Sequence, residues 1–307
     1  MSVGPRRELG TRAAVITQYR RSMLGTVGDL VEDVVVWLDG PVNVASDTKA
    51  VVLRRRGGSA ANMAVSAVRA GTSARFIGQV GAGAHGDVLI DALRADNVDL
   101  VVRRGGRIGT IVVLVDRAGE RTMLSDRGGC TELASPEPWW LDGLDTLHVP
   151  LYSLVVSPLA DTAETLIGWA HERDITVSID ASSTAVITEY GVDRVVAMLA
   201  RLHPTVLLCN EMEAACLGEA VHPQRIGARV TVVKQGAGPA LVMVPQSPPA
   251  SVPALAIEHV RDTTGAGDAF AAGFLIAFAA GASPVEATTA GHHTAMVAIS
   301  RASAAEQ

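Results

Sequence analysis

Residues 262–270, with the sequence Asp-Thr-Thr-Gly-Ala-Gly-Asp-Ala-Phe, constrain the fold and chemistry of this chain more than any other stretch. They follow a short predicted strand at 257–261 and open the apolar run 269–280, which predicts a helix. A Gly-Ala-Gly turn ahead of a helix leaves backbone N–H groups unpaired and lets a phosphate approach without Cβ obstruction, and the helix dipole favours the negative charge. Asp268 falls in the first helical turn, where a carboxylate is suited to take a proton from a hydroxyl that attacks phosphorus. The alternative is an ordinary helix start in which Asp268 complements the dipole.

The composition indicates one large α/β domain. The chain has 307 residues, of which 48% are hydrophobic and 4% aromatic, and strand and helix patterns alternate along it. A net charge of −6 without a long basic run argues against a nucleic-acid partner. Cys130, Cys209 and Cys216 have neither metal-ligand spacing nor an even count, which indicates reduced thiols. No apolar run reaches the roughly 18 residues of a membrane span and no signal-peptide core is present, so we expect a soluble, cytoplasmic protein without a membrane partner.

Residues 1–22 show no strong periodicity and precede the first predicted strand at Met23. We interpret them as an N-terminal extension, a basic tail outside the fold. The domain proper is predicted to span residues 23–307.

The N-terminal half contains groups that suit a polyol. Gly57-Gly58-Ser59-Ala60-Ala61-Asn62 opens a predicted helix. Paired glycines let the backbone come close to a polyol, and the Asn62 amide offers both a donor and an acceptor to neighbouring hydroxyls. A plain turn followed by a helix start explains the same residues. Around this motif, residues 34–56 and 98–126 form two β-rich excursions that leave the main body.

The second half repeats strand and helix with short joints, which predicts a mostly parallel sheet with helices on both faces. Strands are predicted at 146–149, 175–180, 206–210, 230–234 and 240–244, and helices at 157–173, 189–202, 211–218, 268–281 and 284–300. Ligands of such sheets bind beyond the carboxyl ends of the strands. The polar residues at such ends are Asp180, Asn210, Gly236 and the loop at Asp262.

Two short motifs in this half have both a functional and a structural interpretation. Asn210 and Glu213 lie three apart in a first helical turn, where they either form a capping box or hold the water shell of a magnesium ion. Residues 234–238, Lys-Gln-Gly-Ala-Gly, join two strands, so hairpin chemistry alone explains both glycines.

The string at 262–270, taken with Asp33, the motif at 57–62, Asn210-x-x-Glu213 and the glycine loop at Gly236, resembles the ribokinase-like (PfkB) family of carbohydrate and nucleoside kinases. The resemblance covers residues 23–304 in family order. It implies a three-layer α/β/α sandwich with a mostly parallel central sheet, plus a small β-sheet lid formed by residues 34–56 and 98–126.

The resemblance also implies roles for particular residues, with ATP and Mg²⁺ as the implied cofactors. The catalytic group would consist of Asp268 as general base and the amides of Gly265, Ala266 and Gly267. The substrate would be held by Asp33, Gly57, Gly58, Asn62 and Tyr152. The nucleotide would be bound by Asn210, Lys234, Gly236, Gly238, Thr264 and His292, the last packing against adenine. Magnesium would be reached through water from Glu213. In potassium-activated relatives K⁺ is held at positions that match Asp262, Thr264 and the carbonyls of Ala298, Arg301 and Ser303, although Ser303-Ala304 replaces the family's terminal Gly-Ala.

The expected reaction is transfer of the ATP γ-phosphoryl group to a hydroxyl of a small sugar or sugar acid. Tyr152 suits donation to a sugar-acid carboxylate and also stacking on a nucleoside ring. With only 4% aromatic residues to hold a base, a sugar or sugar acid comes first, and an adenosine-like nucleoside kinase is the alternative within the family. A non-catalytic sugar- or nucleotide-binding regulator is the alternative from another class. An intact Gly-Ala-Gly-Asp string opposes it.

The lid sequence makes a further prediction about assembly. Val34, Val36, Ile111, Val113 and Val115 fall at alternating positions within their strands, as one buried face requires. A sheet of this size standing away from the body exposes its other face. The closed active site or a second subunit would cover it, and the resemblance favours a homodimer through the lid.

Overall fold

A computed structural model describes residues 22–257, 260 and 263–305, and the side chains as far as Arg301. The predicted tail, residues 1–22, therefore lies outside the described residues except for Ser22, and so does Asp262. In the described part no helix is both long and apolar enough to cross a membrane.

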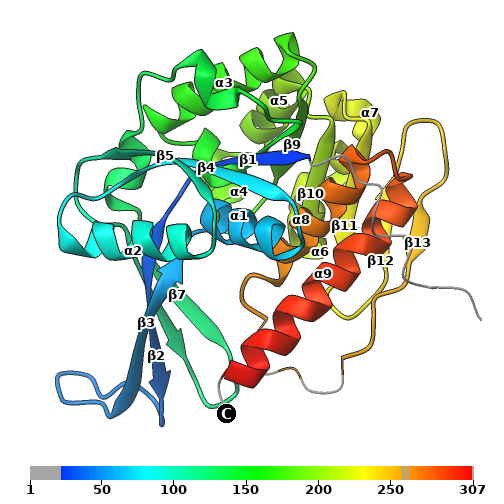
Figure 1. Cartoon of the computed structure of the whole chain (residues 1–307). Coiled ribbons are helices and arrows are strands. Elements are labelled where there is room, and N and C mark those ends of the chain that lie inside the picture. The colour runs from blue at the N-terminus through cyan, green and yellow to red at the C-terminus, as the bar shows by residue number, and fades with distance from the viewer. Residues whose placement is uncertain (1–21, 258–259, 261–262, 306–307) are drawn as a thin grey trace, which may run out of the picture.

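The body is built on a nine-stranded sheet with the order β13-β12-β11-β10-β9-β8-β1-β4-β5 (Figure 1). Its strands are β1 (Met23–Val27), β4 (Ser73–Val80), β5 (Asp99–Arg104), β8 (Thr146–Pro150), β9 (Thr176–Asp180), β10 (Val206–Asn210), β11 (Val230–Lys234), β12 (Ala240–Met243) and β13 (Ala250–Val252). Neighbours pair in parallel except at β11–β12 and β12–β13, which are antiparallel. The central strands are apolar on both faces, as a sheet covered on both sides requires.

Helices cover both faces of this sheet, so the predicted three-layer sandwich is confirmed. The helices of one face are α1 (Ser59–Arg69), α2 (Ala84–Ala95), α8 (Ala266–Ala279) and α9 (Pro284–Ala305). The helices of the other face are α3 (Leu159–Glu172), α4 (Thr184–Tyr190), α5 (Val192–Leu202), α6 (Glu211–Leu217) and α7 (Pro223–Ile226). Short 3₁₀ turns occur at Gly128–Glu132, Pro138–Leu141, Leu151–Leu154 and Gly218–Val221. Each layer has its own hydrophobic core, with Phe76 and Phe274 buried in one and Trp140 and Leu147 in the other.

A second, four-stranded sheet stands apart from the body, with the order β3-β2-β6-β7 (Figure 1). It contains β2 (Val31–Leu38), β3 (Ala50–Gly57), β6 (Thr110–Val115) and β7 (Arg121–Asp126). The sequence predicted that all of 98–126 would belong to this sheet, and for β5 this is wrong. Strand β5 pairs with β4 at the edge of the large sheet. The β5 side chain of Val101 is buried in the body core, which holds the strand there.

The buried face of β2 also differs from the prediction. Val35 is buried at 3% exposure, whereas Val34 and Val36 are only half-buried and lie on the opposite face. The cause is the register with β6, in which Val35 pairs with Val113 and so shares its face. The predicted burial of Val113 and Val115 is confirmed, and Ile111 packs against them.

Boundaries in the second half follow the predicted order with local differences. The helix predicted at 189–202 is two helices, because Gly191 separates α4 from α5 with a φ of 102°. Helix α9 continues five residues past the predicted end at 300, to Ala305. Strand β13 was not predicted. The short strand predicted at 257–261 is absent at the described residues Ile257 and Val260.

Candidate active site

The Gly-Ala-Gly turn lies at the start of α8, as predicted. Gly265 is the N-cap residue and has a φ of 75°, in the left-handed region that glycine adopts without strain. The first amides of a helix have no partner within it, but Ala266 N donates a 3.1 Å hydrogen bond to the Thr263 carbonyl. The N–H groups of Gly267 and Asp268 therefore mark the anion-binding end. A Cβ added at Gly267 would lie 3.5 Å from the Lys234 ammonium, which places that cation beside the turn. Residues 264–267, called the cradle below, therefore combine amides, a helix dipole and a nearby cation.

Asp268 lies in the first turn of α8 and faces the N-terminus of α1. Ser59 Oγ donates a hydrogen bond of 2.6 Å to Asp268 Oδ1. Burial raises the pKa of Asp268 to about 6, helped by the charge of Asp180 and opposed by the Ser59 and Asn62 hydrogen bonds and by Lys234. A carboxylate with this pKa is ionised at neutral pH and accepts a proton readily, which suits a general base.

A cavity of about 220 Å³, the substrate cavity, opens in front of Asp268. Its described lining includes Asp33, Gly58, Asn62, Tyr152, Thr264, Gly265 and Asp268. The structure thus brings four of the five predicted substrate residues together with the predicted base. The fifth, Gly57, is not among the described lining residues and lies against the Asp33 carboxylate. Ile111, Val113 and Met123 of the small sheet also line it, so this sheet faces the site.

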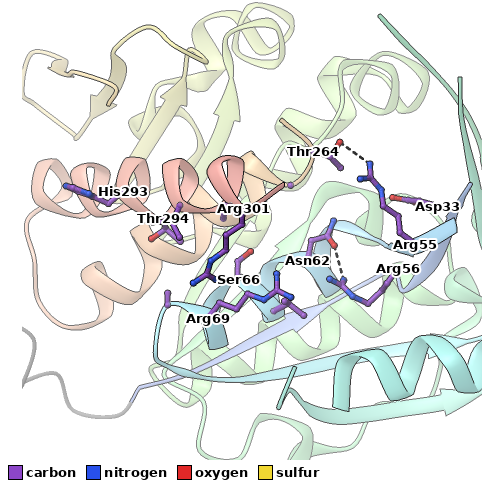
Figure 2. A pocket seen from close by; sticks show the side chains of 16 residues that line it. Asp33, Arg55, Arg56, Asn62, Ser66, Arg69, Thr264, His293, Thr294 and Arg301 are labelled. Carbon is purple, nitrogen blue, oxygen red and sulfur yellow. Dashed lines mark hydrogen bonds between the residues drawn. The ribbon is translucent and has the colours of Figure 1, made fainter. Parts of the chain in front are cut away.

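Asp33 of β2 pairs with Arg55 of β3, two residues before Gly57. The Asp33 carboxylate lies so close to Gly57 that any Cβ there would overlap it, so only glycine fits at position 57. Burial raises the pKa of Asp33, while Arg55 and Arg56 oppose that shift. Arg56 Nη1 in turn donates a 2.9 Å hydrogen bond to Asn62 Oδ1 (Figure 2). Asn62 therefore presents its amide between a guanidinium and the base.

One wall of the substrate cavity is fixed by an ion pair. Arg127 binds Asp29 through two hydrogen bonds of 2.7 and 2.8 Å and donates a third, of 2.8 Å, to the carbonyl of Tyr152. The guanidinium lies 5.8 Å from the centre of the Tyr152 ring. Tyr152 is thereby held at the cavity with one ring face beside a cation.

A polar cluster lies at the carboxyl ends of β9, β10 and β11. Lys234 Nζ donates a 2.7 Å hydrogen bond to Asp180 Oδ2. Burial lowers the pKa of Lys234, but the charge and hydrogen bond of Asp180 outweigh it and raise the value above normal. The lysine is thus a permanent cation beside the cradle.

Asn210 and Glu213 form the capping box at the start of α6. Both Glu213 oxygens accept hydrogen bonds of 2.8 Å from Asn210, and Asn210 Oδ1 accepts one of 2.9 Å from Glu213 N. Burial raises the pKa of Glu213 to about 7, with the charge of Asp180 as the second cause. The described residues contain no group of three His, Cys, Asp or Glu side chains that could hold a metal directly. A magnesium ion fits here through water and phosphate oxygens, the mode that this ion prefers.

Further residues predicted to bind the nucleotide lie in the turn after β11 and on α9. Gly236, with a φ of 58°, and Gly238 form the turn between β11 and β12. His292 is 8% exposed and packs edge-on against Phe270 at 5.2 Å, and its Nε2 has no partner among the described atoms. Burial lowers the pKa of His292, so the ring is neutral.

The predicted cation cage is described only in part, because Asp262 lies outside the described residues. Helix α9 runs without interruption through Ala298, Arg301 and Ser303. A helix directs each carbonyl along its axis toward the amide four residues on, so the Ala298 carbonyl is already used. Ala298, Arg301 and Thr264 instead line a second cavity.

Several residues of the site were not assigned a role from sequence. Tertiary packing brings four such residues to the site, namely Ser59, Arg55, Arg56 and Arg121. Among them, Arg121 donates a hydrogen bond to Thr264. The sequence signals are that Arg54, Arg55 and Arg56 directly precede Gly57 and that Ser59 lies within the motif at 57–62.

The comparisons with known proteins agree with this geometry. A family model described as pfkB family carbohydrate kinase matches residues 26–307. The chain is 31% identical to the ATP-dependent ribose-1-phosphate kinase of Halopiger xanaduensis over 229 residues, which cover 71% of this chain and 72% of that protein. It is 27% identical to the fructokinase of Salmonella typhimurium, with 82% and 87% covered.

Solved structures show the same fold. The adenosine kinase of Sinorhizobium meliloti matches with a TM-score of 0.81 at 21% identity, over 92% of this chain and 94% of that one. The Arabidopsis thaliana ribokinase complexed with ribose and ATP matches with a TM-score of 0.75 at 20% identity, over 92% and 93%.

Proposed function

Because the chain belongs to the pfkB family of carbohydrate kinases, we propose that it transfers the ATP γ-phosphoryl group to a sugar hydroxyl with Asp268 as general base. The protein is an ATP-dependent sugar kinase, a phosphotransferase with an alcohol group as acceptor. The observation that carries the role of Asp268 is its position: a carboxyl with a pKa of about 6 at the end of the cradle and in the wall of the substrate cavity.

The proposed reaction assigns one task to each group. The acceptor oxygen bonds to the γ-phosphorus, the bond from that phosphorus to the ADP oxygen breaks, and the hydroxyl proton goes to Asp268. Asp33 and Asn62 hold neighbouring hydroxyls and so orient the attacking one. The cradle amide of Gly267, with the Lys234 cation beside it, stabilises the charge on the transferring group.

On the nucleotide side, we assign Asn210, Glu213 and Gly236, which lie at or after the carboxyl ends of β10 and β11, to the phosphates. Magnesium, when bound, neutralises phosphate charge, and Glu213 would orient its water shell. Burial raises the pKa of Glu213 to about 7, and both of its carboxylate oxygens accept hydrogen bonds from Asn210. Glu213 would therefore contact the water shell with oxygens that are already hydrogen-bonded.

A sugar acceptor fits the substrate cavity better than a nucleoside. Tyr152 is the one aromatic side chain among the described lining residues, and Arg127 already lies over its ring. A nucleobase would need an aromatic face to stack on. The complete cradle with an ionisable Asp268 also favours a catalyst over a non-catalytic binder.

The test is ADP release from ATP and Mg²⁺ with a panel of pentoses, hexoses, sugar acids and nucleosides. We expect turnover with at least one sugar or sugar acid. Turnover with nucleosides alone would replace the sugar proposal by the nucleoside alternative, and ATP binding without turnover on any acceptor would favour the regulator.

We infer in addition that two copies associate through the small sheet. Its edge strands expose large apolar side chains, namely Val51, Val52, Leu53, Met123 and Leu124. Strand edges and apolar patches of this kind are normally covered. We also assign the enzyme to the cytoplasm, where ATP is available, and its three free cysteines suit that compartment.

A further inference from the structure

The proposed reaction gives no task to the ion pair between Asp29 and Arg127, although both residues line the substrate cavity. Their side chains are 14% and 15% exposed, whereas those of the neighbouring pair, Asp126 and Arg107, are 52% and 75% exposed. Removing two charges from water costs free energy that the attraction between them only partly returns, so a buried pair adds little net stability. The position of the Asp29–Arg127 pair therefore points to a role other than stability.

Both residues lie where the chain passes between the body and the small sheet. Asp29 lies between β1 of the body and β2 of the small sheet. Arg127 lies between β7 of the small sheet and the 3₁₀ turn Gly128–Glu132, which packs against β4. The third hydrogen bond of Arg127 ends on the Tyr152 carbonyl, in the body turn that follows β8. One guanidinium thus joins the segment where the chain first enters the small sheet, the segment where it last leaves it, and the body.

A further contact connects this pair with the catalytic groups. A Cβ added at Gly58 would overlap the carbonyl oxygen of Asp29, so the segment between β1 and β2 lies directly against the segment between β3 and α1. Gly58 has a φ of 100° and is the N-cap residue of α1. The next residue, Ser59, donates the 2.6 Å hydrogen bond to Asp268. A shift of Asp29 would therefore be felt at the start of α1 as well as at Tyr152.

We propose that Asp29 and Arg127 are positioning residues, which hold the small sheet over the substrate cavity and so keep water from the γ-phosphorus of ATP. This inference rests on the proposed function. The small sheet covers the cavity with Ile111, Val113 and Met123, and the Asp29–Arg127 pair fixes the segments from which that cover extends.

Water is the acceptor that competes with the sugar hydroxyl. In the competing reaction the water oxygen bonds to the γ-phosphorus, the bond from that phosphorus to the ADP oxygen breaks, and the proton goes to Asp268. The products are ADP and inorganic phosphate instead of ADP and sugar phosphate. A cover held firmly over the cavity suppresses this hydrolysis, and a loosened cover admits water.

The experiment measures the ratio of inorganic phosphate released to sugar phosphate formed, with ATP and the acceptor both saturating. Arg127→Lys keeps the positive charge but loses the planar fork that binds both Asp29 oxygens and the Tyr152 carbonyl. We expect the ratio and the acceptor KM each to rise about tenfold, the usual effect of losing one charge-assisted hydrogen bond, while the KM for ATP stays unchanged. An unchanged ratio would overturn the inference, even if the acceptor KM rose, because the pair would then support Tyr152 alone.

Asp29→Asn keeps the shape of the partner and removes its charge, and it gives the same test if Arg127→Lys does not fold. Because the two residues act as one pair, the double variant should raise the ratio no further than the single variants do. Additive increases would contradict a shared action.

The matched control is Arg201→Lys on the body, at the opposite end from the small sheet (Figure 1). Arg201 of α5 donates two hydrogen bonds, of 2.7 and 2.6 Å, to Glu164 of α3, so the pair has the same two-point geometry. The control should leave the ratio and the acceptor KM unchanged. A similar rise in Arg201→Lys would show a general loss of stability and overturn the inference.

Hydrogen exchange separates this inference from the kinase proposal. In Arg127→Lys the amides of β2 and β6 should exchange faster, while those of β8 and β9 keep their rates. If the wild-type protein phosphorylates no acceptor, the kinase proposal fails, and this measurement still decides whether the pair holds the small sheet. Unchanged exchange in β2 and β6, or an equal increase in both sheets, would contradict it.

Discussion

Ser59 Oγ donates a hydrogen bond of 2.6 Å to Asp268 Oδ1, although the two residues are 209 positions apart in the chain. The bond joins the N-terminal ends of α1 and α8, the two helices that carry the proposed hydroxyl-holding and catalytic groups. It also lowers the pKa of Asp268 against the larger effect of burial, which raises it to about 6.

The first prediction follows from this bond. A base works in its ionised form, so kcat/KM should fall as the pH drops through about 6, the pKa of Asp268. Ser59→Ala removes a donor that lowers this pKa, so the acid limb of the profile should move to higher pH. Ser300→Ala, on the exposed side of α9, is the control and should leave the midpoint in place. A limb that stays fixed or moves to lower pH in Ser59→Ala would show that Asp268 does not set it.

Asp33→Ala should weaken binding of the acceptor and leave binding of the nucleotide unchanged. Asp33 lines both cavities, and a hydrogen bond to a charged group contributes about 1.5 to 3 kcal/mol, so KM for the acceptor should rise about 10- to 100-fold. The control is Asp39→Ala, which removes an exposed carboxylate beyond the end of β2. Calorimetry with ATP completes the test, since loss of ATP binding with the acceptor KM unchanged would mean that the two halves of the site are assigned the wrong way round.

Helix α8, which begins at the cradle, packs closely against α9. Two glycine-to-alanine substitutions test how close this packing is. A Cβ at Gly273 would overlap Thr294 Oγ1 of α9, so Gly273→Ala should lower the free energy of unfolding by about 1 to 3 kcal/mol. Gly168, on the exposed side of α3, has nothing within 4 Å of such a Cβ, and Gly168→Ala should raise it by about 0.4 to 1 kcal/mol. Urea unfolding measures both, and the same sign for the two variants would contradict the close contact.

The proposed dimer predicts a change of mass. Leu53 is 50% exposed on the edge strand β3, so Leu53→Asp should convert the dimer to a monomer in light scattering at micromolar concentration. Val156→Asp, an exposed apolar site before α3, should not. Val113→Asp is unsuitable, because Val113 lies in the small sheet's own core and its loss would disturb the sheet. A fully active wild-type monomer would rule the dimer out.

The fold was predictable where one pattern pointed to one element. The buried runs at β8 to β11 and the glycine turn before α8 are local signals, and the structure has these elements in the predicted order. The phase of β2 was not predictable, because Val34, Val35 and Val36 are all β-branched and only the register with β6 selects the buried one. Strand β5 was misassigned for a similar reason, since an edge strand carries the same pattern in either sheet.

In the candidate site, too, some residues were predictable from local sequence and others were not. Asp33, Asn62, Tyr152 and Asp268 were predicted and do meet around one cavity. The second cavity could not be predicted, because its arginines come from β3, α1 and α9, and only the packing of α1 and α9 on α8 brings them together. The cation cage stays a prediction: helix α9 uses the Ala298 carbonyl, but Ser303 lies in its last turn and Asp262 lies outside the described residues.

The most direct test of the central claim is the turnover of Asp268→Asn on the acceptor that the wild-type enzyme phosphorylates. Asparagine keeps the shape of the side chain but cannot accept the proton, so kcat should fall by roughly two to four orders of magnitude while ATP binding persists. Turnover equal to that of the wild type would contradict Asp268 as the base.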